Sequence, residues 1–425
     1  MEFKTIGPFR KQMGLPCLER CLTMISVSEA EALVLSHVLR EETCLLSIES
    51  LKAEILQEDL MADRPFPPFH RVAMDGIAIR FSEYEKGLRH FAIQEIQAAG
   101  EPQRTLHDDR HCIEVMTGAV LPKNCDTVIR VEDLTKEGPS VHLIPSCVVR
   151  FGQNVHLQGS DYPDGEVLLS KGTSLLAPQW AVAATIGQSQ ISVSKRPSVA
   201  VVSTGTELVE VTEVPLPHQI RSSNKYALSA FLKQHGFENV SHFHLADSRE
   251  RMFTKLQSLL EEHDVVVLSG GVSMGQFDFV PSVLKDLGVQ EIFHKVAQRP
   301  GKPFWFGVGP EKQMVFGLPG NPVSALTCLV RYLYPALNKK IGVVKNPITV
   351  RLKTDFDFSP KLTLFQPVQV KIEDAELRAF PISLNGSGDL ASLTKSDGFI
   401  ELPPNKAHFA GGEVFPYWHW GGRIL

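Results

Sequence analysis

The sequence predicts a multidomain protein that combines α/β and β domains. In the second half, residues 264–278 (DVVVLSGGVSMGQFD) and 315–326 (VFGLPGNPVSAL) each pass from an apolar strand through a tight turn into the start of a helix. From Pro197 onward strands and helices alternate, which is typical of a mostly parallel sheet with helices on both faces. Residues 77–144 and the chain after Pro347 consist of short β-like runs instead. A chain of 425 residues has room for about two to four domains.

The first part of the chain is predicted to be helical. Ser28 and Glu31 form a capping-box pattern at the start of a helix over residues 29–42, and a second helix is predicted over residues 47–60. Residues 64–69 (RPFPPF) are expected to be extended, because proline fixes φ and biases the residue before it away from helix.

We predict four domains in an elongated molecule. Residues 1–62 and 150–195 form a mixed, largely helical domain, into which a β domain of residues 63–149 is inserted. Residues 196–345 form a three-layer α/β domain with a parallel sheet, and residues 346–425 form a β-barrel-like C-terminal domain.

The α/β domain locates the expected site. Its helix over residues 224–236 is predicted to end at Gly236 in the C′ position. Ligands of parallel sheets bind outside the carboxyl ends of the strands. The loops expected to converge there are residues 203–208, 244–247, 269–278 and 317–322.

Composition excludes several classes of protein. The formal net charge of −5 disfavours nucleic acid or an anionic membrane as a bulk partner. Seven cysteines without a CxxC pair argue against a disulfide framework and a zinc site. Residues 1–14 lack the apolar core of a signal peptide, and no apolar run is long enough to span a bilayer. We therefore expect a cytoplasmic, reduced protein.

Three acids follow the predicted strands. Glu207, Asp247 and Asp278 would lie at one edge of the sheet, where carboxylates can hold Mg²⁺ through oxygen ligands. Each acid alone could instead be an N-cap of the following helix, but three together favour a metal site.

Glycine-rich turns and cations predict anion binding. A strand that ends in a glycine turn before a helix directs backbone N–H groups and the helix dipole at one point. Lys295, Arg299 and Lys302 flank a stiff Pro300–Gly301 turn and could bind a phosphate or another oxyanion, although a solvated surface loop is the alternative.

The first half offers weaker signals. Asp75, Thr117, Asp161 and Asp164 lie in glycine-containing turns, and a purely structural turn explains each of them separately. No Ser-His-Asp or Cys-His grouping is recognisable, and we assign no catalytic role to any histidine.

A set of motifs nevertheless resembles one family. PPFHRVAMDGIA, MTGAVLP, FGQNVHLQGSDY, VSTGTEL, SGGVSMGQFD, RPGKPFWFG, GLPGNPVSAL and GSGDLASL occur in the same order as in the molybdopterin molybdenumtransferase family, which includes the C-terminal domain of gephyrin. The resemblance extends from about residue 25 to the end of the chain. It implies a molybdopterin-binding α/β domain and an enzyme that inserts molybdenum from molybdate into adenylylated molybdopterin.

The resemblance also implies Mg²⁺ dependence, release of AMP from the hydrolysed adenylate, and a homodimer with its active cleft between subunits. Molybdopterin adenylyltransferase and molybdoenzyme apoproteins become candidate partners. Matched by motif, the catalytic residues are Asp75, Asp161, Glu207, Asp247 and Asp278, of which Glu207, Asp247 and Asp278 are also the metal ligands. The matched substrate-binding residues are Thr117, Gly270, Gly271, Ser273, Lys295, Arg299, Lys302, Pro319, Gly320, Asn321, Pro322 and Ser392.

The sequence departs from the family pattern at several positions. His70, Arg71 and Val72 replace the usual Asp-Asn-Ser, and residues 155–158 (VHLQ) replace a basic stretch. Further departures are Thr206 for Asp, Ser222-Ser223 for Asp-Ser or Asp-Thr, Arg299 for Lys, and Leu362 for Arg.

These losses keep alternatives open. A catalytically weakened pterin- or nucleotide-binding protein could act as a scaffold or chaperone in cofactor delivery. An adenylyltransferase that activates molybdopterin would share the α/β domain, but the additional domains argue against it. The sequence does not distinguish molybdate from tungstate.

Overall fold

The computed structural model describes residues 24–39, 42–246, 248–272, 279–343 and 346–421. The chain divides into two compact units. The first consists of Met1–Cys44 and Ser194–Leu425, and the second of Leu45–Val193. Among the described residues, no helix has both the length and the apolar character needed to cross a membrane.

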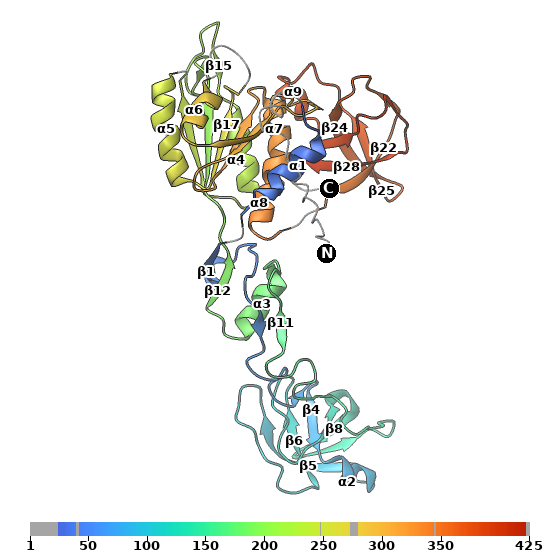
Figure 1. The fold of residues 1–425 in the computed structure, drawn as a ribbon. Helices are drawn as coiled ribbons and strands as arrows, with labels where there is room; N and C mark the ends of the chain where they lie inside the picture. The colour runs from blue at the N-terminus through green and yellow to red at the C-terminus, as the bar shows by residue number, and fades with distance from the viewer. Residues whose placement is uncertain (1–23, 40–41, 247, 273–278, 344–345, 422–425) are drawn as a thin grey trace, which may run out of the picture. The chain divides into compact units, whose positions relative to one another are not determined.

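A six-stranded sheet forms the centre of the α/β domain in the first unit (Figure 1). Its strand order is β16-β13-β17-β21-β20-β18, in which the first four strands are parallel and the last two are antiparallel. The strands are β13 (Val199–Thr204), β16 (Val240–Leu245), β17 (Val265–Ser269), β18 (Gln290–His294), β20 (Trp305–Val308) and β21 (Met314–Leu318). Ser203 pairs with Ser269, and Ser269 pairs with Leu318, so the carboxyl ends of three strands are level.

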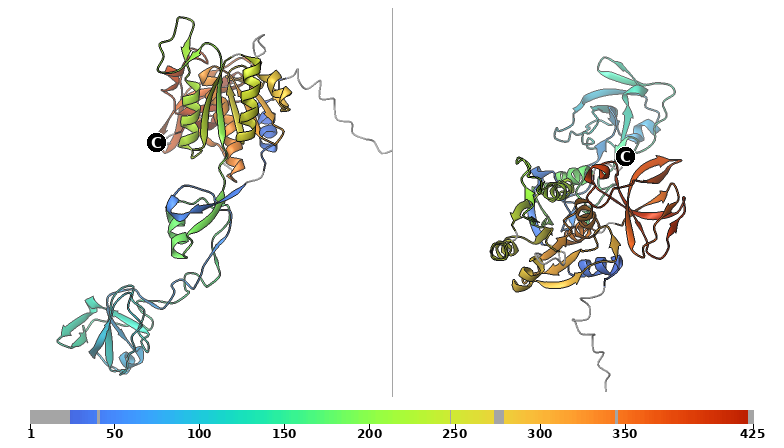
Figure 2. Two further views of the ribbon diagram at one scale, coloured as in Figure 1. Left: turned by 90° about the vertical axis from the view of Figure 1, so that its left-hand side faces the viewer. Right: turned by 90° about the horizontal axis from the view of Figure 1, so that it is seen from above.

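Helices cover both faces of this sheet (Figure 2). Because side chains alternate along a strand, Val202 and Leu268 share one face, and they pack with α5 (Arg249–Glu262) and α6 (Val280–Asp286). The other helices of the domain are α4 (Asn224–Gln234), α7 (Pro322–Cys328), the π-helical segment η4 (Leu329–Leu333) and α8 (Tyr334–Lys340). The three-layer architecture that the sequence predicted is confirmed.

The predicted end of the helix at Gly236 is correct, but the first helix begins earlier than expected. Gly236 has a φ of +84°, the left-handed conformation that favours glycine after a helix. Helix α1 (Val27–Ser36) is capped by Ser26 with Glu29, not by Ser28 with Glu31. Both pairs satisfy the same spacing rule, and Glu31 is instead paired with Arg331.

The predicted helix over residues 47–60 is wrong. After β1 (Thr43–Ser47) the chain makes a short 3₁₀ turn, η2 (Ile48–Ser50), and then runs extended into β2 (Leu60–Met61). The Leu56 N–H donates to the Thr173 carbonyl over 2.9 Å, and Leu56 is completely buried. Pairing with a distant segment thus replaces the local hydrogen bonds of a helix, so helix propensity does not decide the conformation.

The second unit contains its own six-stranded sheet, in the order β7-β4-β6-β5-β9-β8. Its strands are β4 (Gly76–Ile79), β5 (His90–Gln97), β6 (His111–Val115), β7 (Thr127–Arg130), β8 (Leu134–Glu137) and β9 (Ser140–Leu143). The remaining elements of this unit are α2 (Phe81–Glu85), η3 (Val131–Asp133), β3 (Arg71–Val72), β10 (Val155–His156), β11 (Val167–Leu169), α3 (Ala177–Thr185) and β12 (Gln190–Ser194), whose last residue belongs to the first unit.

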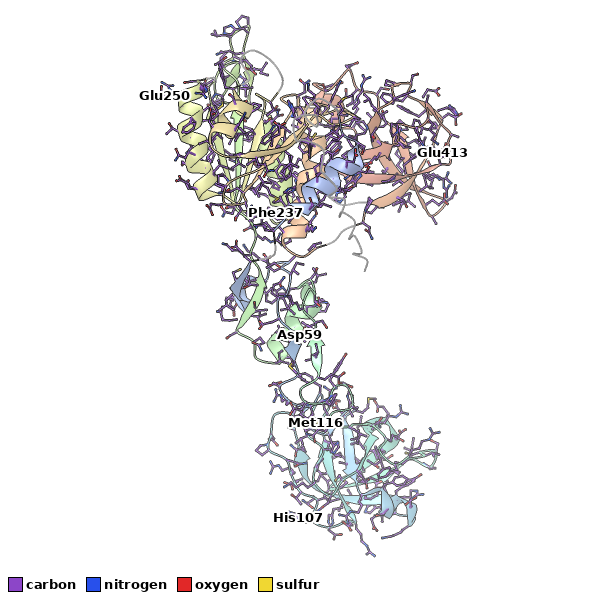
Figure 3. The ribbon with its side chains drawn as sticks, viewed as in Figure 1. Asp59, His107, Met116, Phe237, Glu250 and Glu413 are labelled. Carbon is purple, nitrogen blue, oxygen red and sulfur yellow. The ribbon has the colours of Figure 1, made fainter. Side chains whose placement is uncertain are left out.

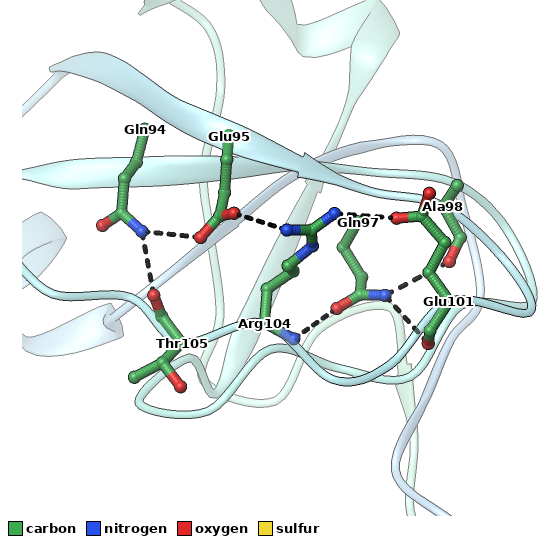
Figure 4. Close-up of polar contacts among 7 residues, drawn as sticks. All are labelled: Gln94, Glu95, Gln97, Ala98, Glu101, Arg104 and Thr105. Carbon is green, nitrogen blue, oxygen red and sulfur yellow. Dashed lines mark hydrogen bonds and ion pairs between the residues drawn. The ribbon is translucent and has the colours of Figure 1, made fainter.

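A buried glutamine holds the loop that follows β5 (Figure 4). Gln97 is fully buried, and its amide donates to the carbonyls of Ala98 and Glu101 while its Oε1 accepts from the Arg104 N–H over 2.6 Å. Arg104 also forms ion pairs with Glu95 and Glu101, at 3.2 and 3.3 Å. The Gln97 amide can be buried because its N–H groups and its carbonyl oxygen all have hydrogen-bond partners.

The C-terminal domain is a closed barrel, as predicted. The strand β24 (Thr363–Glu373) pairs with both β25 and β26, which closes the ring β24-β25-β22-β28-β26. The strand β19 (Gln298–Arg299) adds to β24 in parallel. The other elements are β22 (Ile348–Leu352), β23 (Phe356–Asp357), β25 (Glu376–Pro381), α9 (Leu390–Leu393), β26 (Gly398–Leu402), β27 (His408–Phe409) and β28 (Val414–His419).

Candidate functional site

A pocket of about 710 Å³ lies at the carboxyl ends of the parallel strands in the first unit. Loops after β13, β17 and β21 meet there with the start of α4 and with the barrel residues Gly388 and Leu390. The sequence-predicted residues that line it are Glu207, Gly270, Gly271, Pro319, Gly320, Asn321 and Pro322. Three of the four loops predicted to converge, those around residues 204, 270 and 320, therefore meet here, whereas residues 244–246 do not line the pocket.

The glycines of the first turn are required by its close packing. Gly270 and Gly271 have φ values of +95° and +65°. A Cβ on Gly270 would lie 2.9 Å from the Thr204 carbonyl oxygen, and one on Gly271 would lie 2.8 Å from Thr204 Oγ1. This turn therefore lies directly against the end of β13, which brings its backbone into the pocket wall.

Glu207 presents a carboxylate at the same edge of the sheet. The residue is exposed and lines the pocket. Its Oε2 lies 2.5 Å from the point that a Cβ on Gly205 would take, so the side chain folds back over that glycine. An exposed carboxylate at a pocket edge suits a hard cation such as Mg²⁺.

Two residues that the sequence did not single out organise this pocket. Asn224, at the start of α4, donates from Nδ2 to Ser269 Oγ over 2.7 Å and to the Gly320 carbonyl over 2.8 Å. It thereby joins the two predicted turns. Arg221, in β15 (Ile220–Arg221), which pairs with β14 (Leu208–Val209), is the only basic residue among the described residues that line the pocket. Its Nε donates to the Glu213 carbonyl.

The barrel domain is attached to the second turn. Asn321 Nδ2 donates to Ser387 Oγ over 2.8 Å, and the Val323 N–H donates to the Ser387 carbonyl. Asp389 accepts from the N–H groups of Asn385 and Ser392, and these bonds lower the pKa of its carboxyl to about 2. Ser392 is thus part of the α9 cap and is not among the residues that line the pocket.

The three predicted cations lie outside the lining of the pocket. Arg299 and Lys302 are exposed, and Lys295 is half-buried. The guanidinium of Arg299 lies 5.8 Å from the centre of the Phe358 ring, in the barrel domain. From this segment only Pro303 contributes to the pocket wall.

Two of the three predicted metal ligands fall outside the described residues. Asp247, Ser273 and Asp278 lie outside the described residues. Within the described parts of the chain, no three His, Cys, Asp or Glu side chains are grouped as metal ligands. Glu207 is therefore the one predicted ligand whose position is known.

The second unit holds the other predicted residues. Asp75 Oδ1 accepts from the Thr117 N–H over 2.6 Å and from Thr117 Oγ1 over 2.7 Å. The backbone bond and then the hydroxyl bond lower the pKa of Asp75. The residue after Asp75 has to be a glycine, because a Cβ on Gly76 would lie 1.9 Å from the Ile129 carbonyl oxygen of β7.

Asp161 belongs to a different cluster of the second unit. Its Oδ1 lies 2.8 Å from His156 Nε2, and His156 Nδ1 lies 3.0 Å from an amino nitrogen of Arg71. The sequence had marked Arg71 and His156 only as departures from a family pattern. No signal in the sequence alone predicts that they contact each other, because 85 positions separate them.

Three family models match successive parts of the chain. The MoeA N-terminal region (domains I and II) matches residues 25–187, the probable molybdopterin binding domain matches residues 200–339, and the MoeA C-terminal region (domain IV) matches residues 349–420.

Individual relatives match over nearly their whole length. The molybdopterin molybdenumtransferase of Synechocystis sp. is 40% identical over 399 residues, which cover 93% of this chain and 100% of that protein. The one from Staphylococcus epidermidis is 31% identical and covers 92% of this chain and 94% of that protein. A solved structure of the molybdopterin biosynthesis MoeA protein from Pyrococcus horikoshii has a TM-score of 0.79 and 29% identity, and covers 94% of this chain and 100% of that one.

These matches confirm the family that the motifs predicted. Their coverage includes both compact units and the barrel, so it extends beyond the α/β domain. The chain belongs to the molybdopterin molybdenumtransferase family and is a transferase of molybdenum cofactor biosynthesis.

Proposed function

We propose that this enzyme inserts molybdenum from molybdate into adenylylated molybdopterin, hydrolyses the adenylate and releases AMP in a Mg²⁺-dependent reaction. The observation that carries the proposal is the pocket, where two glycine- or proline-rich turns and Glu207 meet at the carboxyl ends of parallel strands. Its size suits a nucleotide or pterin, and its wall is built from backbone-rich turns that can donate to phosphate oxygens. The relatives named for this activity support the choice of substrate class.

In this proposal the protein mainly positions charged groups. Asn224 holds the two turns together, so their N–H groups meet the phosphates without further ordering. Arg221 supplies a cation at the pocket edge. Glu207, with Asp247 and Asp278, would hold Mg²⁺, which when bound screens the phosphoanhydride and stabilises the leaving AMP. Water adds to the adenylyl phosphorus, the P–O bond to the bridging oxygen breaks, and AMP leaves while molybdopterin keeps the bridging oxygen on its own phosphate.

We further propose that the enzyme is a homodimer located in the cytoplasm. The candidate catalytic residues lie in two different units of the chain, and a cleft between subunits could bring them together. Seven cysteines without a CxxC pair favour a reducing compartment. A molybdopterin adenylyltransferase would supply the substrate, and molybdoenzyme apoproteins would receive the product.

The direct test is AMP release from purified protein with adenylylated molybdopterin, Mg²⁺ and molybdate. We expect AMP to form in step with molybdenum cofactor, and omission of Mg²⁺ to abolish both. If the protein binds the substrate but releases no AMP, the alternative of a catalytically weakened binding scaffold is the better one. That alternative is suggested by the absence of the family's usual basic residues at positions 156–158 and 362.

A further inference from the structure

Three polar side chains of the second unit form a continuous chain of hydrogen bonds. Arg71 and His156 are directly opposite each other on the antiparallel strands β3 and β10. Arg71 contacts His156 Nδ1 at 3.0 Å, and His156 Nε2 contacts Asp161 Oδ1 at 2.8 Å. Both ring nitrogens of the imidazole are therefore used, one toward a cation and one toward an anion.

The chemistry of the partners determines the tautomer of His156. A guanidinium can only donate hydrogen bonds, so His156 Nδ1 must accept. A ring that carries its proton on Nε2 satisfies both contacts, because Nε2–H then donates to the carboxylate of Asp161. A protonated ring would carry a hydrogen on Nδ1 and would lose the contact with Arg71.

A purely stabilising role explains this cluster poorly. The side chains of His156 and Asp161 are 33% and 47% exposed, and Arg71 is also exposed. Polar pairs with this exposure contribute little to folding, typically about 0–1 kcal/mol. The cluster is instead open to a ligand. Arg71 keeps further N–H donors besides the one that it gives to His156.

The loop at Gln158, next to this cluster, is also held by hydrogen bonds to the segment before β3. The Gln158 N–H donates to His70 Nδ1 over 3.1 Å, and the Gln158 side chain donates to the Pro68 carbonyl over 2.9 Å. His70, Arg71, His156 and Gln158 all depart from the pattern that the family resemblance implies. These residues contact each other in two pairs, Arg71 with His156 and His70 with Gln158. The departures from the family pattern are therefore grouped in one part of the surface.

We propose that His156 is a positioning residue, which as the neutral Nε2–H tautomer orients Asp161 for the reaction and aims Arg71 at an oxyanion of the substrate. The inference rests on the proposed function, because it takes Asp161 as a catalytic residue. Arg71 then supplies, from another strand, the positive charge that the residues after β10 lack in this chain. The anion is a phosphate or metal oxyanion, since an arginine fork suits both.

The tautomer can be measured without any assay of activity. Two-bond ¹H–¹⁵N correlation spectra of ¹⁵N-histidine-labelled protein distinguish the neutral Nε2–H ring from the Nδ1–H and cationic rings. The His156 signals are assigned by their loss in His156→Gln. We expect the Nε2–H form at neutral pH, and a changed Nδ1 signal in Arg71→Gln. An Nδ1–H or cationic ring in the wild type overturns the proposal.

The positioning role is tested by AMP release from matched variants. His156→Gln keeps one acceptor and one donor, so we expect kcat/KM to stay within about threefold of the wild type, or ~0.7 kcal/mol. His156→Leu removes both bonds and should lower kcat/KM at least about tenfold, with an unchanged thermal midpoint. His107→Leu is the control, since this exposed histidine (labelled in Figure 3) donates to Gln94 Oε1 through its backbone N–H, which the substitution keeps.

The outcomes separate the two proposals. An unchanged kcat/KM in His156→Leu, or an equal loss in His156→Gln and His156→Leu, overturns the positioning role. Absence of AMP release from the wild-type protein overturns the proposed function and, with it, the role in catalysis. The NMR spectra would still decide whether the Arg71–His156–Asp161 bonds exist.

Discussion

Asp75 and Thr117 are joined by two hydrogen bonds to a single carboxylate oxygen. The Thr117 N–H and hydroxyl donate to Asp75 Oδ1 over 2.6 and 2.7 Å. Both bonds favour the ionised form, so Asp75 has a lowered pKa although it is exposed to solvent. The arrangement keeps this carboxylate charged and holds it in place through one of its two oxygens.

Thr117→Val is expected to raise the pKa of Asp75 toward its ordinary value, because it removes the hydroxyl bond and keeps the backbone bond. A depressed carboxyl pKa favours folding above the unfolded value of 3.8, and this contribution is lost as the pH falls through the folded pKa. Titration of the Asp75 carboxyl carbon by NMR measures the shift. Thr117→Ser retains the hydroxyl and should titrate like the wild type; identical curves for the valine variant would contradict the role of Oγ1.

Glu207→Gln is expected to weaken Mg²⁺-dependent AMP release while the fold persists. The exposed carboxylate is not needed for packing, whereas Mg²⁺ binds a neutral amide oxygen less well. The Mg²⁺ concentration for half-maximal rate should rise about tenfold or more, that is by ~1.4 kcal/mol. We predict the same for Asp247→Asn and Asp278→Asn. Glu210→Gln is the matched control, since Glu210 pairs with Lys225 and does not line the pocket; an equal effect there would argue against a metal ligand at residue 207.

Arg221→Ala should raise the KM for adenylylated molybdopterin more than Arg299→Ala does. Arg221 lines the pocket, while Arg299 lies beside Phe358. Loss of one charge-assisted hydrogen bond costs about 1.5–3 kcal/mol, or roughly ten- to a hundredfold in affinity. Steady-state kinetics of the two variants make the comparison. If only Arg299→Ala raises KM, or raises the molybdate requirement, the role predicted for Arg299 from sequence is the correct one.

Arg331→Met should destabilise the first unit. Arg331 is 4% exposed and binds Glu31 of α1 and Glu401 of β26 over 2.8 Å each. Burial acts to lower the pKa of Arg331, but the interactions with Glu31 and Glu401 outweigh the effect of burial and raise this pKa. Removing one member of a buried ion network typically costs about 3–5 kcal/mol, and the partial exposure of both glutamates places this case near the lower end.

Chemical denaturation measures this loss. Arg351→Met is the control, because Arg351 pairs with Glu376 at a site that is more than a third exposed, where the expected cost is below about 1 kcal/mol. Adding Glu31→Gln and Glu401→Gln to Arg331→Met should recover part of the stability. Equal losses in the two arginine variants would contradict the special role of Arg331.

Sedimentation at micromolar protein concentration should find a dimer. The candidate catalytic residues Asp75 and Asp161 lie in one unit, and Glu207 lies in the other. A monomer with full AMP-releasing activity would exclude a cleft that needs two subunits.

The sequence by itself determined the features that depend on local chemistry. Apolar runs ending in glycine and proline predicted the strands of the α/β domain and the turns at Gly270 and Pro319, and the structure brings these turns into one pocket. Gly236 marked the end of α4 correctly, since only the left-handed conformation is needed there. The order of the motifs was sufficient to predict the family.

Tertiary structure decided the features that depend on distant partners. Residues 47–60 do not form the predicted α-helix, because the backbone of residues 56 and 57 pairs with residues 173 and 192, although their composition favours a helix. Ser26 rather than Ser28 caps α1, while Glu31 pairs with an arginine that lies 300 positions away. Asn224 and Arg221 line the pocket, and Arg71 contacts His156, because the fold brings together segments that are distant in sequence. Such contacts depend on how the chain folds back on itself, and no local pattern of residues encodes them.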